Sequence, residues 1–300
     1  MNKDTDTLQR FLFEHAAIRG EVVHLDHSWL QVLQRHDYPP TVRDLLGESL
    51  TAAVLLSATI KTEGTITIQV QASGSVTLLV AEISVAKNEH GEIKRTLRGV
   101  ANWNGEIKPG NLKDIFGDGQ IVITIEPSGS KERFQGIVAL EGEDMAEALV
   151  GYLKQSEQLE TRMWLESSEQ GTAGLLIQRM PASDQTDDED WNRISQLATT
   201  ISRDELLQLA SRELIHRLFH EEDIRLFDHE GINFYCNCSR DRVANMLRTL
   251  GRDELMTLVK EQNEIHVACE FCKQDYGFDI VDIEQILQTD TPFPSPERQQ

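Results

Sequence analysis

Two short cysteine motifs near the C-terminus constrain this chain more than any other feature. The run YCNCS holds Cys236 and Cys238, and the run ACEFC holds Cys269 and Cys272, with 30 residues between the two pairs. The chain has no other cysteine. Two close pairs on facing turns can supply the four thiolates of a closed tetrahedral zinc site. The spacing therefore predicts one zinc ion, bound by these four side chains.

Two alternatives to this site are open to the same residues. His266 lies three residues before Cys269 and could replace one sulfur, which would give three cysteine ligands and one histidine. A thioredoxin-like role would need the C-x-x-C pair to open a helix after a strand, whereas IHVACEFC leads into the turn-rich run KQDYGFD. We favour the four-cysteine zinc site. Three other histidines lack a metal-like pattern and are expected to be solvated: His216, His220 and His229.

Composition excludes several classes of function. A formal charge of -21 over 300 residues repels phosphate backbones and argues against a nucleic-acid partner. No apolar stretch is long enough to cross a membrane, and the N-terminal run MNKDTDTLQR lacks the order of a secretory signal, so a cytoplasmic protein is expected. No nucleophile elbow, P-loop or H-E-x-x-H motif is present. We therefore assign no catalytic residue and do not expect an enzyme.

Residues 1–182 are predicted to form one α+β core domain. A mostly buried helix should begin near Thr41, and a second helix should cover 143–158. The ranges 64–86 and 119–140 are β-rich runs divided by turn residues, so each is predicted to be a hairpin. A loop with short turns is expected at 105–119, and two further strands in the runs MWLES and AGLLIQRMP.

Residues 183–230 are predicted to be an acidic helical linker. They hold 13 Asp or Glu residues against 5 Arg. Ser202 and Glu205 form a capping-box pattern, and apolar residues then follow along one face of a helix that ends near His220: Leu207, Ala210, Leu214 and Leu218. The linker is either an ordinary connector, which composition favours, or a marginally stable segment that stays folded only while docked. A small zinc domain (231–290) and a disordered tail (291–300) complete the organisation.

Several phrases of this sequence resemble one known family. FYCNCSRDRV, HVACEFCKQDYGFD, GLLIQRMP and LLSATIKTEGTITIQV are similar to the redox-regulated thirty-three-kilodalton heat-shock chaperone family, over nearly the full length. The resemblance carries the family's four zinc ligands over to the four cysteines. It implies that oxidation pairs Cys236 with Cys238 and Cys269 with Cys272.

The resemblance also implies a function. It points to an ATP-independent holdase that is inactive when reduced and zinc-bound, and that binds unfolding client proteins as a dimer when oxidised. Loss of zinc forfeits about 10 to 16 kcal/mol in small zinc modules, which is comparable with the stability of a whole domain. Zinc loss should therefore unfold 231–290 and free the linker. A thiol-disulfide oxidoreductase and a constitutive zinc-stabilised interaction module are the alternatives.

Overall fold

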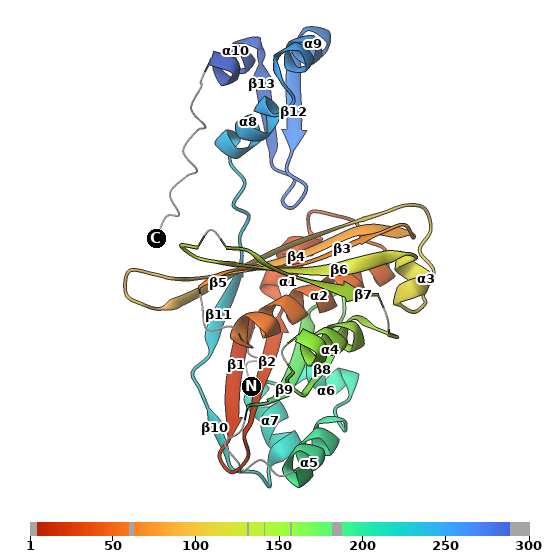
Figure 1. Cartoon of the computed structure of the whole chain (residues 1–300), viewed down its shortest axis with the longest axis vertical. Helices are drawn as coiled ribbons and strands as arrows, with labels where there is room; N and C mark the ends of the chain where they lie inside the picture. Colours follow the sequence, from red (N-terminus) through yellow and green to blue (C-terminus); the bar gives the residue numbers. More distant parts are fainter. Residues whose placement is uncertain are drawn as a thin grey trace. The chain divides into compact units, whose positions relative to one another are not determined.

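A computed structural model describes residues 5–59, 63–130, 132–140, 142–156, 158–181 and 188–288 (Figure 1). The expected tail at 291–300 lies outside these residues, as does part of the acidic run after Pro181. The fold mixes helices and strands, so the α+β prediction is confirmed. No described helix has the length and apolar character that crossing a bilayer requires.

Helix α2 (Pro40–Thr59) organises the core. Pro40 stands at its first position, where a missing N–H costs nothing, so the predicted start near Thr41 is confirmed. Thirteen of its twenty residues are buried, because strands pack on several of its sides. This burial explains why its sequence is rich in Leu and Ala and carries no single polar stripe. The predicted helix over 143–158 is also confirmed, as α4 (Met145–Ser156).

Eleven described strands form one extended sheet, in which most neighbours are antiparallel. Along the sheet the order is β7-β6-β3-β4-β5-β11-β1-β2-β9-β8, and β10 also pairs with β1. The strands are β1 (Thr7–Phe13), β2 (Ile18–Leu25), β3 (Gly64–Ala72), β4 (Val76–Lys87), β5 (Ile93–Trp103), β6 (Gly119–Pro127), β7 (Phe134–Ala139), β8 (Thr161–Ser167), β9 (Thr172–Arg179), β10 (Ile224–Leu226) and β11 (Glu230–Phe234). Helix α2 packs on strands from both ends of this order, so it lies between two half-sheets (Figure 1).

The sequence-based hairpins are confirmed, but they are not the whole sheet. β3 pairs with β4, and β6 pairs with β7, as expected. β3 also pairs with β6, and β4 pairs with β5, which joins both hairpins into one half-sheet. β1, β2 and β5 were not predicted. The loop at 105–119 contains α3 (Leu112–Phe116), whose first turn is closed by a capping box between Asn111 and Asp114.

The linker contains three described helices. Two of them follow Ser202, where the sequence predicted one continuous helix. These are α5 (Asp188–Ala198), α6 (Arg203–Gln208) and α7 (Ser211–Phe219). The capping box of Ser202 and Glu205 is confirmed. The single helix is wrong because Leu209 and Ala210 adopt extended backbone angles, which turns the chain so that α6 and α7 both face the core strands.

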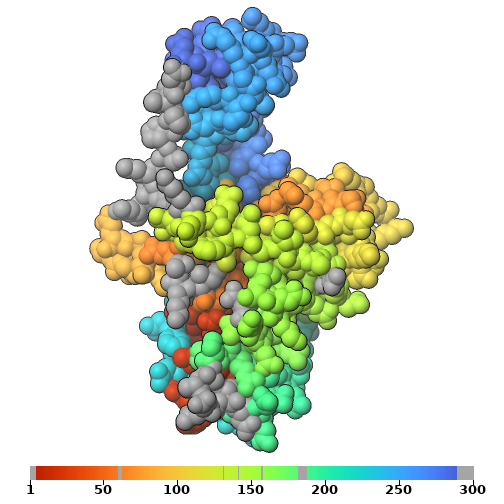
Figure 2. All heavy atoms as spheres, viewed as in Figure 1, coloured from red at the N-terminus to blue at the C-terminus, as the bar shows by residue number. Residues whose placement is uncertain are grey.

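The chain divides into two compact units, Met1–Tyr235 and Cys236–Gln300. The linker belongs to the first unit, whereas we expected boundaries after residues 182 and 230. The reason is that β11, at 230–234, is a strand of the core sheet. In the space-filling view the linker helices form part of the outer surface of the first unit (Figure 2). The first unit also contains a further short helix, α1 (His27–Leu33).

The second unit is small. Its elements are α8 (Arg240–Arg248), α9 (Arg252–Gln262), β12 (Glu264–Ala268), β13 (Asp275–Asp279) and α10 (Ile280–Gln288). β12 and β13 form an antiparallel hairpin. Among its described residues, nine buried apolar side chains make up the core of this unit. Such a core is too small to stabilise a domain easily without a further crosslink.

Candidate metal centre

The C-x-x-C pair lies on the turn that joins β12 to β13. Cys269 directly follows β12, its N–H donates to the carbonyl of Gln274 at 2.9 Å, and its own carbonyl accepts from Lys273 N–H at 2.7 Å. Lys273 has a φ of 57°, in the left-handed region. The chain therefore reverses tightly around Cys269 and Cys272, and brings both sulfurs to the same end of the hairpin.

The C-x-C pair lies between the last core strand and α8. Cys236 comes two residues after the end of β11, and Ser239 caps α8 by accepting a hydrogen bond from Arg242 N–H at 3.2 Å. The cap fixes where the helix begins, and Cys238 is the residue directly before this cap.

The structure brings all four predicted ligands together. Their sulfur atoms lie within 4.8 Å of one another, with 3.3 Å between Cys238 and Cys272 and 3.7 Å between Cys236 and Cys269. Four sulfurs at about 2.3 Å from a central zinc would be about 3.8 Å apart. The cluster therefore fits a tetrahedral metal. It is the only such group of His, Cys, Asp or Glu side chains among the residues that the structure describes.

Without a metal, two of the four thiols resist ionisation. Burial raises the pKa of Cys236 and of Cys272. Burial also opposes ionisation of Cys238, but hydrogen bonds outweigh it and lower the pKa of that thiol; the first of these comes from the Tyr276 hydroxyl, 3.1 Å from the sulfur. A divalent cation would supply the charge that favours the deprotonated form of Cys236 and Cys272.

His266 interacts with two carboxylates and is not one of the clustered ligands. Its Nδ1 lies 2.7 Å from Asp275 and its Nε2 lies 3.4 Å from Glu264, on the exposed side of the β12–β13 hairpin. Hydrogen bonding to Asp275 raises the pKa of the imidazole, which favours the protonated form that cannot bind a metal. The four cysteines are therefore the donor set that this geometry supports.

The linker helices cover one face of the half-sheet made by β1, β2 and β9. This linker interface, defined by its buried apolar residues, contains Phe11, Phe13, Ile18, Val22, Ala173, Leu175 and Ile177 from the strands, and Trp191, Ile194, Ala198, Leu206, Leu214, Ile215, Leu218 and Phe219 from the helices. The ring of Phe219 lies 5.1 Å from that of Phe13 and 6.0 Å from that of Phe11. The ring of Phe11 covers Gly20, where any Cβ would lie 2.1 Å from it.

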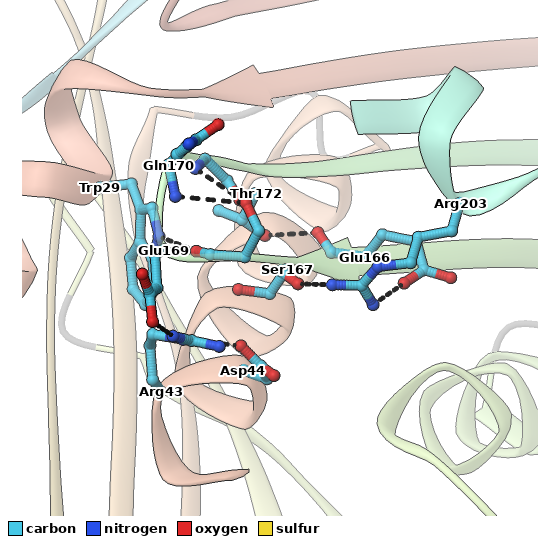
Figure 3. Close-up of polar contacts among 11 residues, drawn as sticks. Trp29, Arg43, Asp44, Glu166, Ser167, Glu169, Gln170, Thr172 and Arg203 are labelled. Atoms are coloured by element: carbon cyan, nitrogen blue, oxygen red, sulfur yellow. Dashed lines mark hydrogen bonds and ion pairs between the residues drawn. The ribbon is translucent and has the colours of Figure 1, made fainter. Parts of the chain in front are cut away.

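Polar contacts at the edge of the linker interface join residues that are far apart in the sequence. Arg203 of α6 donates to Glu166 of β8 at 2.7 Å and also to the carbonyl of Ser167 (Figure 3). The buried ring of His24 lies 3.0 Å from the carbonyl of Leu206 and 3.3 Å from the hydroxyl of Ser211. Sequence reasoning missed these residues, because no local pattern signals a contact across more than thirty residues.

Comparison with known proteins places this chain in a family. A family model described as Hsp33 protein matches residues 6–279. The 33 kDa chaperonin of Nitrosococcus oceani is 47% identical over 289 residues, which cover 96% of each chain, and that of Methylobacillus flagellatus is 44% identical over 97% of each. The crystal structure of the 33 kDa chaperonin of Thermotoga maritima superimposes with a TM-score of 0.79 at 20% identity, over 94% of this chain and 98% of that one. The chain therefore belongs to the Hsp33 family.

Proposed function

We propose that this protein is a redox-regulated, ATP-independent holdase whose switch is a zinc ion held by Cys236, Cys238, Cys269 and Cys272. The observation that carries the proposal is the four-sulfur cluster in a unit whose described residues include only nine buried apolar side chains. Zinc, when bound, would keep the four thiolates together. The fold of the second unit then depends on the metal, as it does in other small zinc modules.

Oxidation would remove both the ligands and the metal. Peroxide takes two electrons from a pair of thiols, one S–S bond forms, and the two thiol protons leave with the peroxide oxygens as two waters. The pairing proposed from the family resemblance is Cys236 with Cys238 and Cys269 with Cys272. Two such bonds use all four ligands, so zinc leaves and the second unit loses its crosslink.

The linker would be the next part to loosen. Its described helices contribute eight of the buried residues of the linker interface, and the strands contribute seven. The linker segment also carries a large excess of acidic residues, which weakens its folded state by self-repulsion. Once it detaches, aromatic and aliphatic side chains of β1, β2 and β9 become available to the apolar segments of unfolding client proteins. The net charge of -21 would keep such complexes soluble.

The proposed partners follow from the same reasoning. Clients are unfolding proteins of no fixed identity, the active form is a homodimer, and nucleic acid is disfavoured by the acidic charge. A reducing compartment such as the cytoplasm suits four free thiols. The alternatives are a thiol-disulfide oxidoreductase, which would turn over disulfide substrates, and an interaction module that the metal stabilises permanently.

Light scattering of a heat-unfolding client tests the proposal. The oxidised, zinc-depleted protein should suppress aggregation without ATP, the reduced zinc-bound protein should not, and reductant with zinc should restore the inactive state. Equal protection by both forms would support the permanent module. Catalytic reduction of insulin disulfides would support the oxidoreductase.

A further inference from the structure

Strand β11 occupies an unusual place in the core sheet. In the strand order it lies between β5 and β1, parallel to the first and antiparallel to the second (Figure 1). The half-sheet β7-β6-β3-β4-β5 and the half-sheet β1-β2-β9-β8 are therefore joined through it. It is also the last element of the first unit, and its end at Phe234 is two residues from Cys236.

The backbone of β11 is hydrogen-bonded to its neighbours on both sides. On one side Ile232, Asn233 and Phe234 stand in register with Arg95, Thr96 and Leu97, and the N–H of Tyr235 donates to the carbonyl of Leu97 at 3.0 Å. On the other side the N–H of Ile232 donates to the carbonyl of Asp6 at 2.8 Å. Departure of β11 would leave unpaired donors and acceptors on two strands at once, which is a template for another extended chain.

The side chains of β11 define what this slot accepts. Ile232 is 2% exposed and belongs to the main core, and Phe234 packs against the same core under the guanidinium of Arg35, 4.6 Å from the ring centre. Gly231 and Asn233 are exposed. The slot therefore takes apolar side chains at two alternate positions and is indifferent to the residue between them.

An acidic position precedes the two apolar ones. The carboxylate of Glu230 lies 2.7 Å from Arg10 and 2.8 Å from Arg95, and the guanidinium of Arg95 is only 4% exposed. Arg95 also donates to the hydroxyl of Ser57 on α2 at 2.7 Å. Without Glu230 the buried Arg95 and the partly exposed Arg10 would both lose this counter-charge, so the slot favours an acidic residue at this position.

β11 itself is a weak strand for this slot. Gly231 and Asn233 have low strand propensity, and a Cβ added at Gly231 would meet no atom within 4 Å. The glycine is therefore not required by packing. Once the linker helices, β10 and β11 have all detached, β11 competes for the slot only from the end of a long tether, and its effective concentration at the slot falls as the tether lengthens. A segment with better strand residues can then compete with it.

We propose that, in the activated chaperone, β11 leaves and an extended segment of an unfolded client, of the pattern acidic-x-apolar-x-apolar, takes its place between β5 and β1. This client slot is distinct from the linker interface, which lies on a sheet face, whereas the slot is bounded by strand edges. The proposal rests on the proposed holdase function, because it assumes that oxidation frees the end of the first unit.

Hydrogen exchange of the full-length protein tests the slot. The probe is the peptide KKEVIVFKK, and the matched peptide KKKVIVFKK reverses the acidic position. The amides of 93–99 that bond to β11, and not those that bond to β4, should exchange at least about tenfold faster after oxidation, and the first peptide should restore their protection. The charge-reversed peptide should bind at least about tenfold more weakly. Light scattering on the same sample reports holdase activity independently.

Three results would overturn the proposal while leaving the holdase function intact. The amides of 93–99 that bond to β11 could stay protected in an oxidised sample that suppresses aggregation, which would mean that β11 never leaves. The peptide could protect only the strands of the linker interface. Protection could return without peptide as protein concentration rises, which would mean that a second copy supplies the strand. If the oxidised sample fails to suppress aggregation, the proposed function itself fails.

Discussion

Glu166 of β8 and Arg203 of α6 form an ion pair of 2.7 Å between the core and the linker. Both side chains are partly exposed, at 30% and 52%, so water screens the pair and its contribution is small. The buried apolar residues of the linker interface must therefore provide most of the docking free energy. Two substitutions separate these contributions.

Arg203→Ala should loosen the linker only slightly. An exposed ion pair contributes about 0.2 to 1 kcal/mol, so proteolytic cleavage of the reduced, zinc-bound protein within the linker should accelerate by no more than about fivefold. Limited proteolysis measures this rate. Arg212→Ala, at an exposed arginine of α7, is the matched control and should leave the rate unchanged. An Arg203→Ala protein with a fully detached linker would show that the pair is the principal anchor.

Phe219→Ala should release the linker. Phe219 is 1% exposed and contacts the rings of Phe11 and Phe13, and truncation of a buried Phe costs about 3 to 5 kcal/mol. The reduced variant should therefore suppress client aggregation while it still holds zinc. Light scattering and metal analysis on one sample check both statements. Phe134→Ala, at a residue that is 55% exposed, is the control. An inactive reduced variant with a detached linker would contradict exposure of this face as the activating step.

Cys269→Ser should abolish metal binding and unfold the second unit, because one of four ligands is lost and the nine-residue apolar core is small. The main core around α2 should stay folded, since its cluster includes no residue of the second unit, whereas the linker helices should loosen as proposed for the oxidised protein. Metal analysis and hydrogen exchange resolved by region measure the two effects. Tyr276→Phe, which removes only the hydroxyl near Cys238, should retain the metal. A folded, metal-free Cys269→Ser protein would refute a metal-dependent fold.

Glu48→Gln should stabilise the first unit at alkaline pH. Burial, followed by repulsion from Asp144, raises the pKa of Glu48 from 4.5 to about 8. Between pH 4.5 and about pH 8, Glu48 keeps its proton in the folded chain and loses it in the unfolded chain. The free energy of unfolding therefore falls as the pH rises through this range. The amide cannot ionise. The variant should gain at least about 1 kcal/mol over the parent at pH 8, and less at pH 5.

Urea unfolding of the reduced protein at both pH values measures that difference. Glu89→Gln, at an exposed glutamate in the turn between β4 and β5, serves as the control and should follow the parent at each pH. If the free energy of unfolding of Glu48→Gln depended on pH as that of the parent does, burial of Glu48 would not destabilise the folded protein at alkaline pH.

The sequence predicted the parts of this molecule whose signals are local. Pro40 marked the start of α2, Ser202 and Glu205 marked that of α6, and the cysteine spacing placed four ligands that the structure brings within 4.8 Å. The break at Leu209 and Ala210 was not predictable, because the apolar pattern continues across it and only docking on the strands explains the turn.

β11 was missed for a related reason. Its five residues include Gly231 and Asn233, which are poor strand formers, and its pairing partners lie near residues 7 and 95. A strand that is stabilised by partners so far away in the sequence cannot be recognised from its own five residues. The same holds for Glu230, whose role depends on Arg10 and Arg95.

The position of β11 in the chain also bears on how this protein is made. Synthesis runs from the N-terminus, so the nine strands from β1 to β9 leave the ribosome before residue 230 has been added. During that interval β1 and β5 are open edges on a nascent chain, which is the condition under which strands pair with the wrong partner. A protein proposed to protect others from aggregation is thus itself exposed to it until its own last core strand arrives.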